Sequence, residues 1–346
     1  MKKFTALTVS SMLALSLLGG TCVYAADETE ASTEVASSMD GSDYKVALCV
    51  TSLVNDGSWS QVAYEGLVKA EKELGVQTSY AENCQPADME AILTDYASQG
   101  YNLIIGHSFM FGDPAMSVSE RYPDVHFAIT EGTVGSDNVA SYNIGTHELA
   151  YLCGVLAAQM TKTNKLGCVM GVQGPAIVKC AEGFKLGAKS INPDIKIEVS
   201  YTGSFDDAAI AKEAALAMAD DGVDFIMSGC NSAGSGVIKA CEERGILCIG
   251  ESRDMNSEAP DTVVTSEIFD FTRLIYQSIV DEVSGNFVGG ARNVCLKDDP
   301  EIAKFAPYHG FEDKIPDEVK KGVEDARAKI ESGELIVPII EEPTED

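Results

Sequence analysis

The most constraining feature of this chain is an internal repeat. A short apolar run at 45–50 leads through a polar loop into a helical pattern, and the same order returns from residue 165. Residues 92–105 and 214–227 each continue with a helical pattern, a glycine and a second apolar run. Buried parallel strands read as short continuous apolar runs that alternate with helices. The repeat therefore predicts an α/β chain of two doubly wound parallel-sheet lobes, with a cleft between them that suits a small molecule.

The same patterns predict the individual elements. In the first half we expect strands at 45–50, 77–81, 102–106, 126–130 and 139–144, with helices at 60–74, 89–98, 117–121 and 148–160. In the second half we expect strands at 167–170, 196–201, 225–228, 247–250 and 262–266, with helices at 177–191, 206–220, 236–244, 271–283 and 317–332. Lobe one should comprise 44–163 plus 268–297 and lobe two 164–267, while the pattern leaves 298–346 unassigned.

The N-terminal residues have the features of an export signal. Lys2 and Lys3 precede an apolar stretch too short to span a bilayer, and small residues end the segment at Ala25. Residues 1–25 are therefore predicted to be a signal peptide, and 26–43, rich in Ser, Thr and Glu, a flexible linker. Cys22 leaves two alternatives open, because it is either a site of lipid attachment or part of the removed peptide. We expect an exported protein, either tethered to the outer face of the membrane, periplasmic or secreted.

Composition excludes several classes of function. The formal net charge is −29, which argues against binding nucleic acid or anionic lipid. Ten cysteines occur without Cys-x-x-Cys or zinc-finger spacing, so we interpret them as small apolar residues and predict no metal or cofactor. No nucleophile–base or metal motif indicates an enzyme, and we expect a monomer.

Candidate binding residues lie in the loops that follow the predicted strands, because ligands of open parallel sheets bind at the carboxyl ends of the strands. These loops are rich in aromatic and carboxylate side chains, which suit the faces and polar edges of a heterocycle. The candidates are Asn55, Asp56, Trp59, Ser108, Phe109, Phe111, Glu131, Phe205, Asn231 and Asp254. Three of them have alternative roles: Trp59 as a core residue, Phe205 as a hydrophobic contact for the following helix, and Asp254 as a turn residue.

Several of these loops resemble, in the same order, those of the basic membrane protein family, also called the purine nucleoside receptor-like family. The resemblance rests on 55–61 (Asn-Asp-Gly-Ser-Trp-Ser-Gln), 108–114 (Ser-Phe-Met-Phe-Gly-Asp-Pro) and 122–127 (Tyr-Pro-Asp-Val-His-Phe). Shorter matches at 191–194, 205–208 and 260–266 extend it to nearly the whole exported part. Members of the family are substrate-binding proteins of ABC importers.

The resemblance implies a type I periplasmic-binding-protein fold with a three-segment hinge. It also implies a purine held between two aromatic side chains, here Trp59 and Phe205, and ribose held by an Asp, here Asp254, and a Lys. This chain has Phe269 where that lysine would be, which favours a free base over a nucleoside. The implied partners are a purine nucleoside or nucleobase and the permease and ATPase subunits of an importer. An enzyme acting on a nucleoside and an extracellular sensor remain the alternatives.

Overall fold

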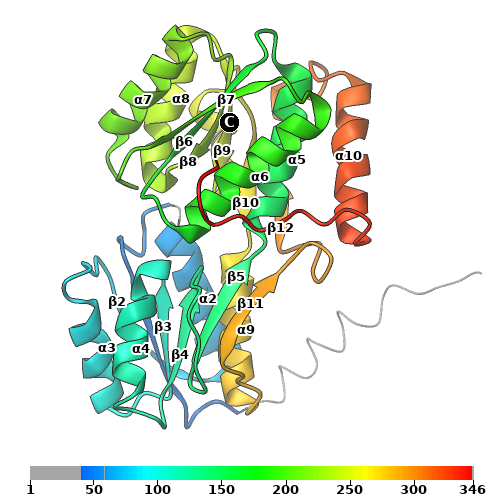
Figure 1. Cartoon of the computed structure of the whole chain (residues 1–346). Helices are drawn as coiled ribbons and strands as arrows, with labels where there is room; N and C mark the ends of the chain where they lie inside the picture. Colours follow the sequence, from blue (N-terminus) through cyan, green and yellow to red (C-terminus); the bar gives the residue numbers. More distant parts are fainter. Residues whose placement is uncertain (1–39, 58, 345–346) are drawn as a thin grey trace, which may run out of the picture. The chain divides into compact units, whose positions relative to one another are not determined.

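The computed structural model describes residues 40–57 and 59–344. The predicted signal peptide, Cys22 and most of the predicted linker lie outside the described residues. Figure 1 shows the described chain as two α/β lobes, each with helices on both faces of its sheet. The predicted fold class is confirmed.

Lobe one contains a six-stranded parallel sheet in the order β11-β5-β4-β3-β1-β2. Its strands are β1 (Lys45–Val50), β2 (Gln77–Ala81), β3 (Leu103–His107), β4 (His126–Thr130), β5 (Val139–Ile144) and β11 (Gly290–Val294). Helices α2 (Trp59–Leu74) and α9 (Phe271–Val283) pack against each other, as do α3 (Met89–Ser98) and α4 (Gly112–Ser119). Because helices cover both faces, the central strand β3 is buried at every residue.

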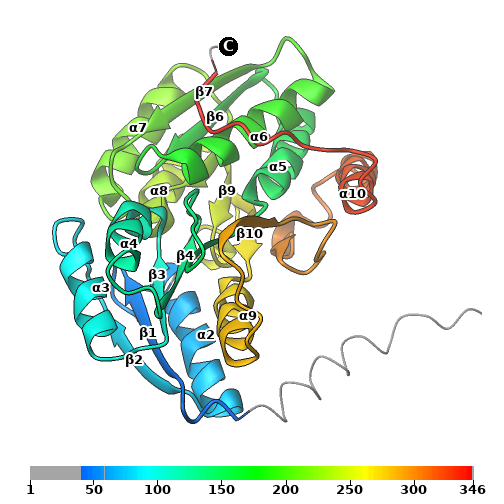
Figure 2. The same ribbon diagram turned by 60° about the horizontal axis from the view of Figure 1, so that its bottom comes forward.

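Lobe two contains a second six-stranded sheet in the order β12-β10-β9-β8-β6-β7, parallel except for the edge strand β12. Its strands are β6 (Lys165–Met170), β7 (Lys196–Tyr201), β8 (Phe225–Gly229), β9 (Leu247–Glu251), β10 (Val263–Phe269) and β12 (Ala303–Phe305). Its helices are α5 (Thr146–Met160), α6 (Pro175–Ile191), α7 (Ala208–Asp220), α8 (Gly234–Arg244) and α10 (Asp317–Glu331). Helix α5 packs on α6 and α10, and α7 packs on α8; Figure 2 shows these two groups apart from each other.

Three segments of the chain connect the lobes, after β5, after β10 and after β11. The segments are hydrogen-bonded near the crossings. The Gly145 N–H donates to the Val294 carbonyl at 2.8 Å, and the Asp270 N–H donates to the Ile302 carbonyl at 2.9 Å. Such short linked segments are typical of a hinge, where a few residues absorb a change in the angle between two domains.

The first crossing differs from the prediction that 44–163 belongs to lobe one. Helix α5 packs on α6 and α10, so the chain enters lobe two at Gly145 rather than after residue 163. Most residues of α5 are buried. Its apolar sequence therefore predicts a buried helix but does not indicate which lobe the helix packs against. The segment left unassigned contributes β12 and α10 to lobe two. The helix predicted at 117–121 lies earlier, as α4, and the short strands β11 and β12 were not predicted.

Candidate functional site

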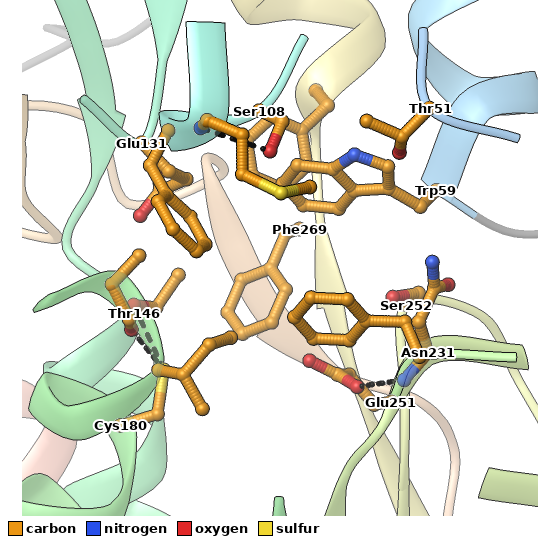
Figure 3. Close-up of a pocket in the computed structure, with 16 residues that line it drawn as sticks. Thr51, Trp59, Ser108, Glu131, Thr146, Cys180, Asn231, Glu251, Ser252 and Phe269 are labelled. Atoms are coloured by element: carbon orange, nitrogen blue, oxygen red, sulfur yellow. Dashed lines mark hydrogen bonds between the residues drawn. The ribbon is translucent and has the colours of Figure 1, made fainter. Parts of the chain in front are cut away.

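A pocket lies between the carboxyl ends of the two sheets. Its cavity volume, measured for the centres of water-sized spheres, is about 60 Å³. Lobe one lines it with the starts of α2 and α9 and the loops after β1, β3 and β4. Lobe two lines it with the loops after β7, β8 and β9, the end of β10 and the first turns of α5 and α6. Figure 3 shows Trp59 and Ser108 on one side of this space and Glu251 and Asn231 on the other.

Aromatic rings form much of the pocket wall: Trp59, Phe109, Phe205, Phe269 and Phe271. Two glycines in the loop after β6 make room for two of these rings. A Cβ at Gly171 would overlap the ring of Phe205, and a Cβ at Gly174 would come within 2.8 Å of the ring of Phe109. Because Phe109 belongs to lobe one and Gly174 to lobe two, this contact also joins the lobes.

The indole of Trp59 is held in place by His107. The two rings stack with centroids 4.1 Å apart, and the indole N–H donates to the His107 carbonyl at 3.3 Å. The His107 imidazole bonds the Trp59 carbonyl at 3.0 Å and the Thr130 hydroxyl at 2.9 Å. Burial lowers the pKa of His107 to about 3, so this imidazole is neutral. His107 covers one face of the indole, and the ring of Phe271 also contacts it, with centroids 4.5 Å apart at an interplanar angle of 64°. Trp59 also lines the pocket.

Glu131 links the lobes from inside the pocket wall. It follows β4 with a φ of +54°, and its Oε1 accepts a hydrogen bond from the Ile144 N–H at 2.8 Å. Its Oε2 lies 2.6 Å from the Lys179 Nζ of α6, and both side chains are buried. Burial opposes the charge of Lys179, but the Glu131 carboxylate leaves the pKa of that amine above its ordinary value. This buried ion pair therefore spans from lobe one to lobe two.

Glu251 is the second carboxyl of the pocket. It is the last residue of β9, and its Oε2 accepts a hydrogen bond from the Asn231 N–H at 2.9 Å. Burial raises the pKa of Glu251 to about 7, against the opposing effect of that hydrogen bond. Glu251 can therefore act either as an acceptor alone or as a donor and acceptor near neutral pH.

Seven of the predicted candidates line the pocket: Trp59, Ser108, Phe109, Glu131, Phe205, Asn231 and Phe269. The other four are not among the lining residues. Asn55 is exposed in its loop. The Asp56 carboxylate accepts hydrogen bonds from the Ser60 and Gln61 N–H groups, and so caps the start of α2.

Phe111 and Asp254 are the other two residues that lie outside the pocket. Phe111 is fully buried in the core of lobe one. The Asp254 carboxylate is exposed and bonds the His309 Nε2 at 2.6 Å. Its second oxygen accepts a hydrogen bond from the Asn256 N–H, a contact typical of a turn residue. The end of a strand identifies a loop near the pocket, but the local backbone conformation decides which side chains of that loop point into the pocket.

Sequence reasoning missed several lining residues. Glu251 and Ser252 come directly after the buried run of β9, so a stricter rule that takes the first residues past a strand would have found them. Thr146, Ile177 and Cys180 come from the first turns of α5 and α6. No sequence signal marks these, because they reach the pocket only through the packing of α5 on α6.

The described residues contain no cluster of three or more His, Cys, Asp or Glu side chains arranged for a metal ion. None of the helices in this described part of the chain is both long enough and apolar enough to cross a membrane.

Comparison with known proteins identifies relatives over nearly the whole described chain. Residues 44–340 match the family of PnrA-like ABC transporter substrate-binding proteins. A purine-binding protein of Brucella abortus is 33% identical over 261 residues, 75% of this chain and 72% of that protein. The ABC transporter nucleoside-binding protein BmpA of Lactococcus lactis is 36% identical over 53% of this chain and 54% of its own length.

Solved structures agree with these relatives. An ABC transporter solute-binding protein from Aeropyrum pernix superimposes with a TM-score of 0.77 at 25% identity, covering 86% of this chain and 94% of that one. The family expected from the loop motifs is thus confirmed: the chain belongs to the PnrA-like family of ABC transporter substrate-binding proteins.

Proposed function

We propose that the protein captures a purine base in the pocket between its lobes and delivers it to the permease and ATPase subunits of an ABC importer, outside the cytoplasmic membrane. The observation that carries the proposal is a pocket with five aromatic rings and two carboxyls. Aromatic faces stack on a flat heterocycle, and the carboxyls supply partners for its polar edge. The purine-binding relative of Brucella abortus supports the ligand class.

The preference for a base over a nucleoside follows from the surroundings of the two ribose-binding positions. Phe269 stands where the ribose lysine was expected, and its ring lines the pocket. The expected ribose carboxylate, Asp254, is bound to His309 and does not line the pocket. Neither position therefore offers a free charged partner for sugar hydroxyls.

The first test is calorimetric titration of adenine and adenosine into the protein and into Trp59→Ala. Stacking of a base on an aromatic ring contributes about 1–3 kcal/mol in nucleic-acid systems, so the variant should bind adenine roughly tenfold to hundredfold more weakly. Tyr80→Ala is the matched control, because Tyr80 is an exposed aromatic of lobe one outside the pocket. Equal affinities for Trp59→Ala and Tyr80→Ala would contradict the stacking role.

The second test separates base from nucleoside. Asp254→Ala should leave adenine affinity unchanged, since its carboxylate partners His309. Tight binding of adenosine that Asp254→Ala abolishes would instead show that the ligand is a nucleoside. Recovery of unaltered inosine after incubation with the protein would count against the enzyme alternative.

A further inference from the structure

Two acidic side chains stand next to each other at the lobe-two side of the pocket. Glu251 of β9 and Glu267 of β10 are register partners in the parallel sheet, so their side chains leave the sheet on the same face. Glu267 is 2% exposed, and its Oε1 has no hydrogen-bond partner. A buried oxygen left without a partner is tolerated far better on a neutral carboxylic acid than on a carboxylate.

The groups around this pair do not neutralise two negative charges. Cys153 of α5 contacts Glu267. Two more thiols lie close enough to interact electrostatically with these carboxyls: Cys180 of α6 with both, and Cys230 with Glu251. Lys179, the buried amine of α6, is held by Glu131 at 2.6 Å. Burial first, and then the charge of Glu251, raise the pKa of Glu267 well above its ordinary value. Burial and the unpartnered Oε1 therefore favour the neutral form of Glu267 over the carboxylate, and Glu251 lies beside it in the same surroundings.

Glu251 presents a defined hydrogen-bonding pattern to the pocket. Its Oε2 accepts the Asn231 N–H at 2.9 Å and keeps a second lone pair, while the other oxygen lies away from Asn231 (Figure 3). If the proton sits on that other oxygen, the group offers an O–H donor beside a carbonyl acceptor. Such a pair complements an edge with a bare ring nitrogen beside an N–H group, as adenine has.

We propose that Glu251 binds the ligand as a neutral carboxylic acid, donating to a ring nitrogen and accepting from the neighbouring N–H group of a purine base. The proposal rests on the proposed function and specifies which hydrogen bonds recognise the edge of the base. An ionised Glu251 would instead need two adjacent N–H donors, so protonation of this one side chain decides which purine edges fit the pocket.

The sign of the pH dependence follows from this protonation state. Below about pH 7 Glu251 already carries its proton, so adenine affinity should be constant. Above that pH the proton must be taken up on binding, and affinity should fall by about tenfold per pH unit. Calorimetry at about pH 8 in buffers of different ionisation enthalpy should show uptake of close to one proton.

The deciding variant is Glu251→Gln, whose amide donates and accepts at every pH. It should bind adenine with an affinity independent of pH and without proton uptake. Glu282→Gln is the matched control: Glu282 is a buried carboxyl outside the pocket, bonded to His126 in lobe one, and burial raises its pKa as well. This variant should keep the wild-type pH profile.

Three results would overturn the proposal: a flat profile in the wild type, affinity that rises with pH, or a wild-type slope retained in Glu251→Gln. If the fall of adenine affinity with pH is lost in Glu267→Gln but kept in Glu251→Gln, the proton taken up on binding belongs to Glu267 instead. These outcomes leave the proposed function standing, because adenine still binds. Failure of adenine and hypoxanthine to bind at any pH from about 5.5 to 9 would reject the proposed function and this proposal together.

Discussion

At the scale of single residues, buried polar side chains set the geometry of the pocket. Glu131 and Lys179 form an ion pair from one lobe to the other, and His107 supports the indole of Trp59. Buried charged and polar groups must find partners or pay a large desolvation cost. Each of these residues therefore ties pocket geometry to the stability of the fold.

Lys179→Met should strongly reduce the free energy of unfolding. Removing one partner of a buried pair leaves an uncompensated charge, here on Glu131, at a cost of about 3–5 kcal/mol. Denaturant unfolding measures the loss, and adding Glu131→Gln to the same chain should restore part of it. The exposed pair Arg244–Asp220 gives the control, since Arg244→Met should cost at most about 1 kcal/mol. Equal losses for the two methionine variants would contradict a structural role for the ion pair.

His107 should make stability depend on pH in a defined direction. Its folded pKa is about 3, lowered by burial from 6.5, so between these values only the unfolded chain binds the proton. Stability from this group is complete above about pH 6.5 and decreases as the pH falls toward 3. His107→Phe cannot bind the proton, so the wild type should lose stability relative to it by up to about 1.4 kcal/mol per pH unit. Parallel pH curves from urea unfolding of the two proteins would exclude this effect.

At the scale of elements, the packing of α5 against α6 positions the first turns that line the pocket. Glycines occur on both helices at this contact: Gly154 on α5, and Gly183 and Gly187 on α6. A Cβ at any of them would overlap the backbone of the other helix. The helices therefore approach more closely than larger residues would permit, and Thr146 and Cys180 meet with a sulfur–oxygen distance of 3.1 Å.

Gly187→Ala should destabilise the protein by roughly 1–3 kcal/mol or more, because the new methyl group would overlap the carbonyl of Tyr151. Adenine affinity should fall as well, since α6 would have to move. Thermal or denaturant unfolding measures the first effect and calorimetry the second. Gly310→Ala is the control, because its Cβ would meet no atom within 4 Å. Similar stability of the two variants would show that α5 and α6 are not tightly fitted.

At the scale of the whole described molecule, three connecting segments and a pocket between two lobes indicate closure around a ligand. The Glu131–Lys179 pair and the contact of Phe109 with Gly174 both cross between the lobes. These contacts are available only when the lobes are close together, so we interpret the structure as the closed form.

Adenine should therefore make the protein both more compact and more stable. At one hundred times its dissociation constant, a ligand that binds only the folded state adds about 2.7 kcal/mol to the free energy of unfolding. Small-angle scattering should show a smaller radius of gyration with ligand than without. At the same ligand concentration, Trp59→Ala should show a smaller gain in the free energy of unfolding and a smaller decrease in the radius of gyration. Stabilisation without compaction would argue against closure of the hinge.

The sequence by itself determined the two-lobe α/β architecture and most of its elements. Strands such as β3, buried at every residue, appear as apolar runs because both faces of a parallel sheet are covered. It also indicated the loops that form the pocket, because carboxyl ends of parallel strands gather at one edge. The short strand β11 escaped prediction, since its residues alternate between exposed and partly buried without an apolar run.

Only the tertiary structure decided which lobe holds α5 and which loop side chains enter the pocket. Phe111 and Asp254 follow strands as the lining residues do, yet one is buried in the core and the other pairs with His309. The pairing of Glu251 with Glu267 was equally hidden, because it depends on the register of β9 against β10. Such contacts join residues far apart in the chain, and local periodicity describes only which face of an element is buried, not what covers it.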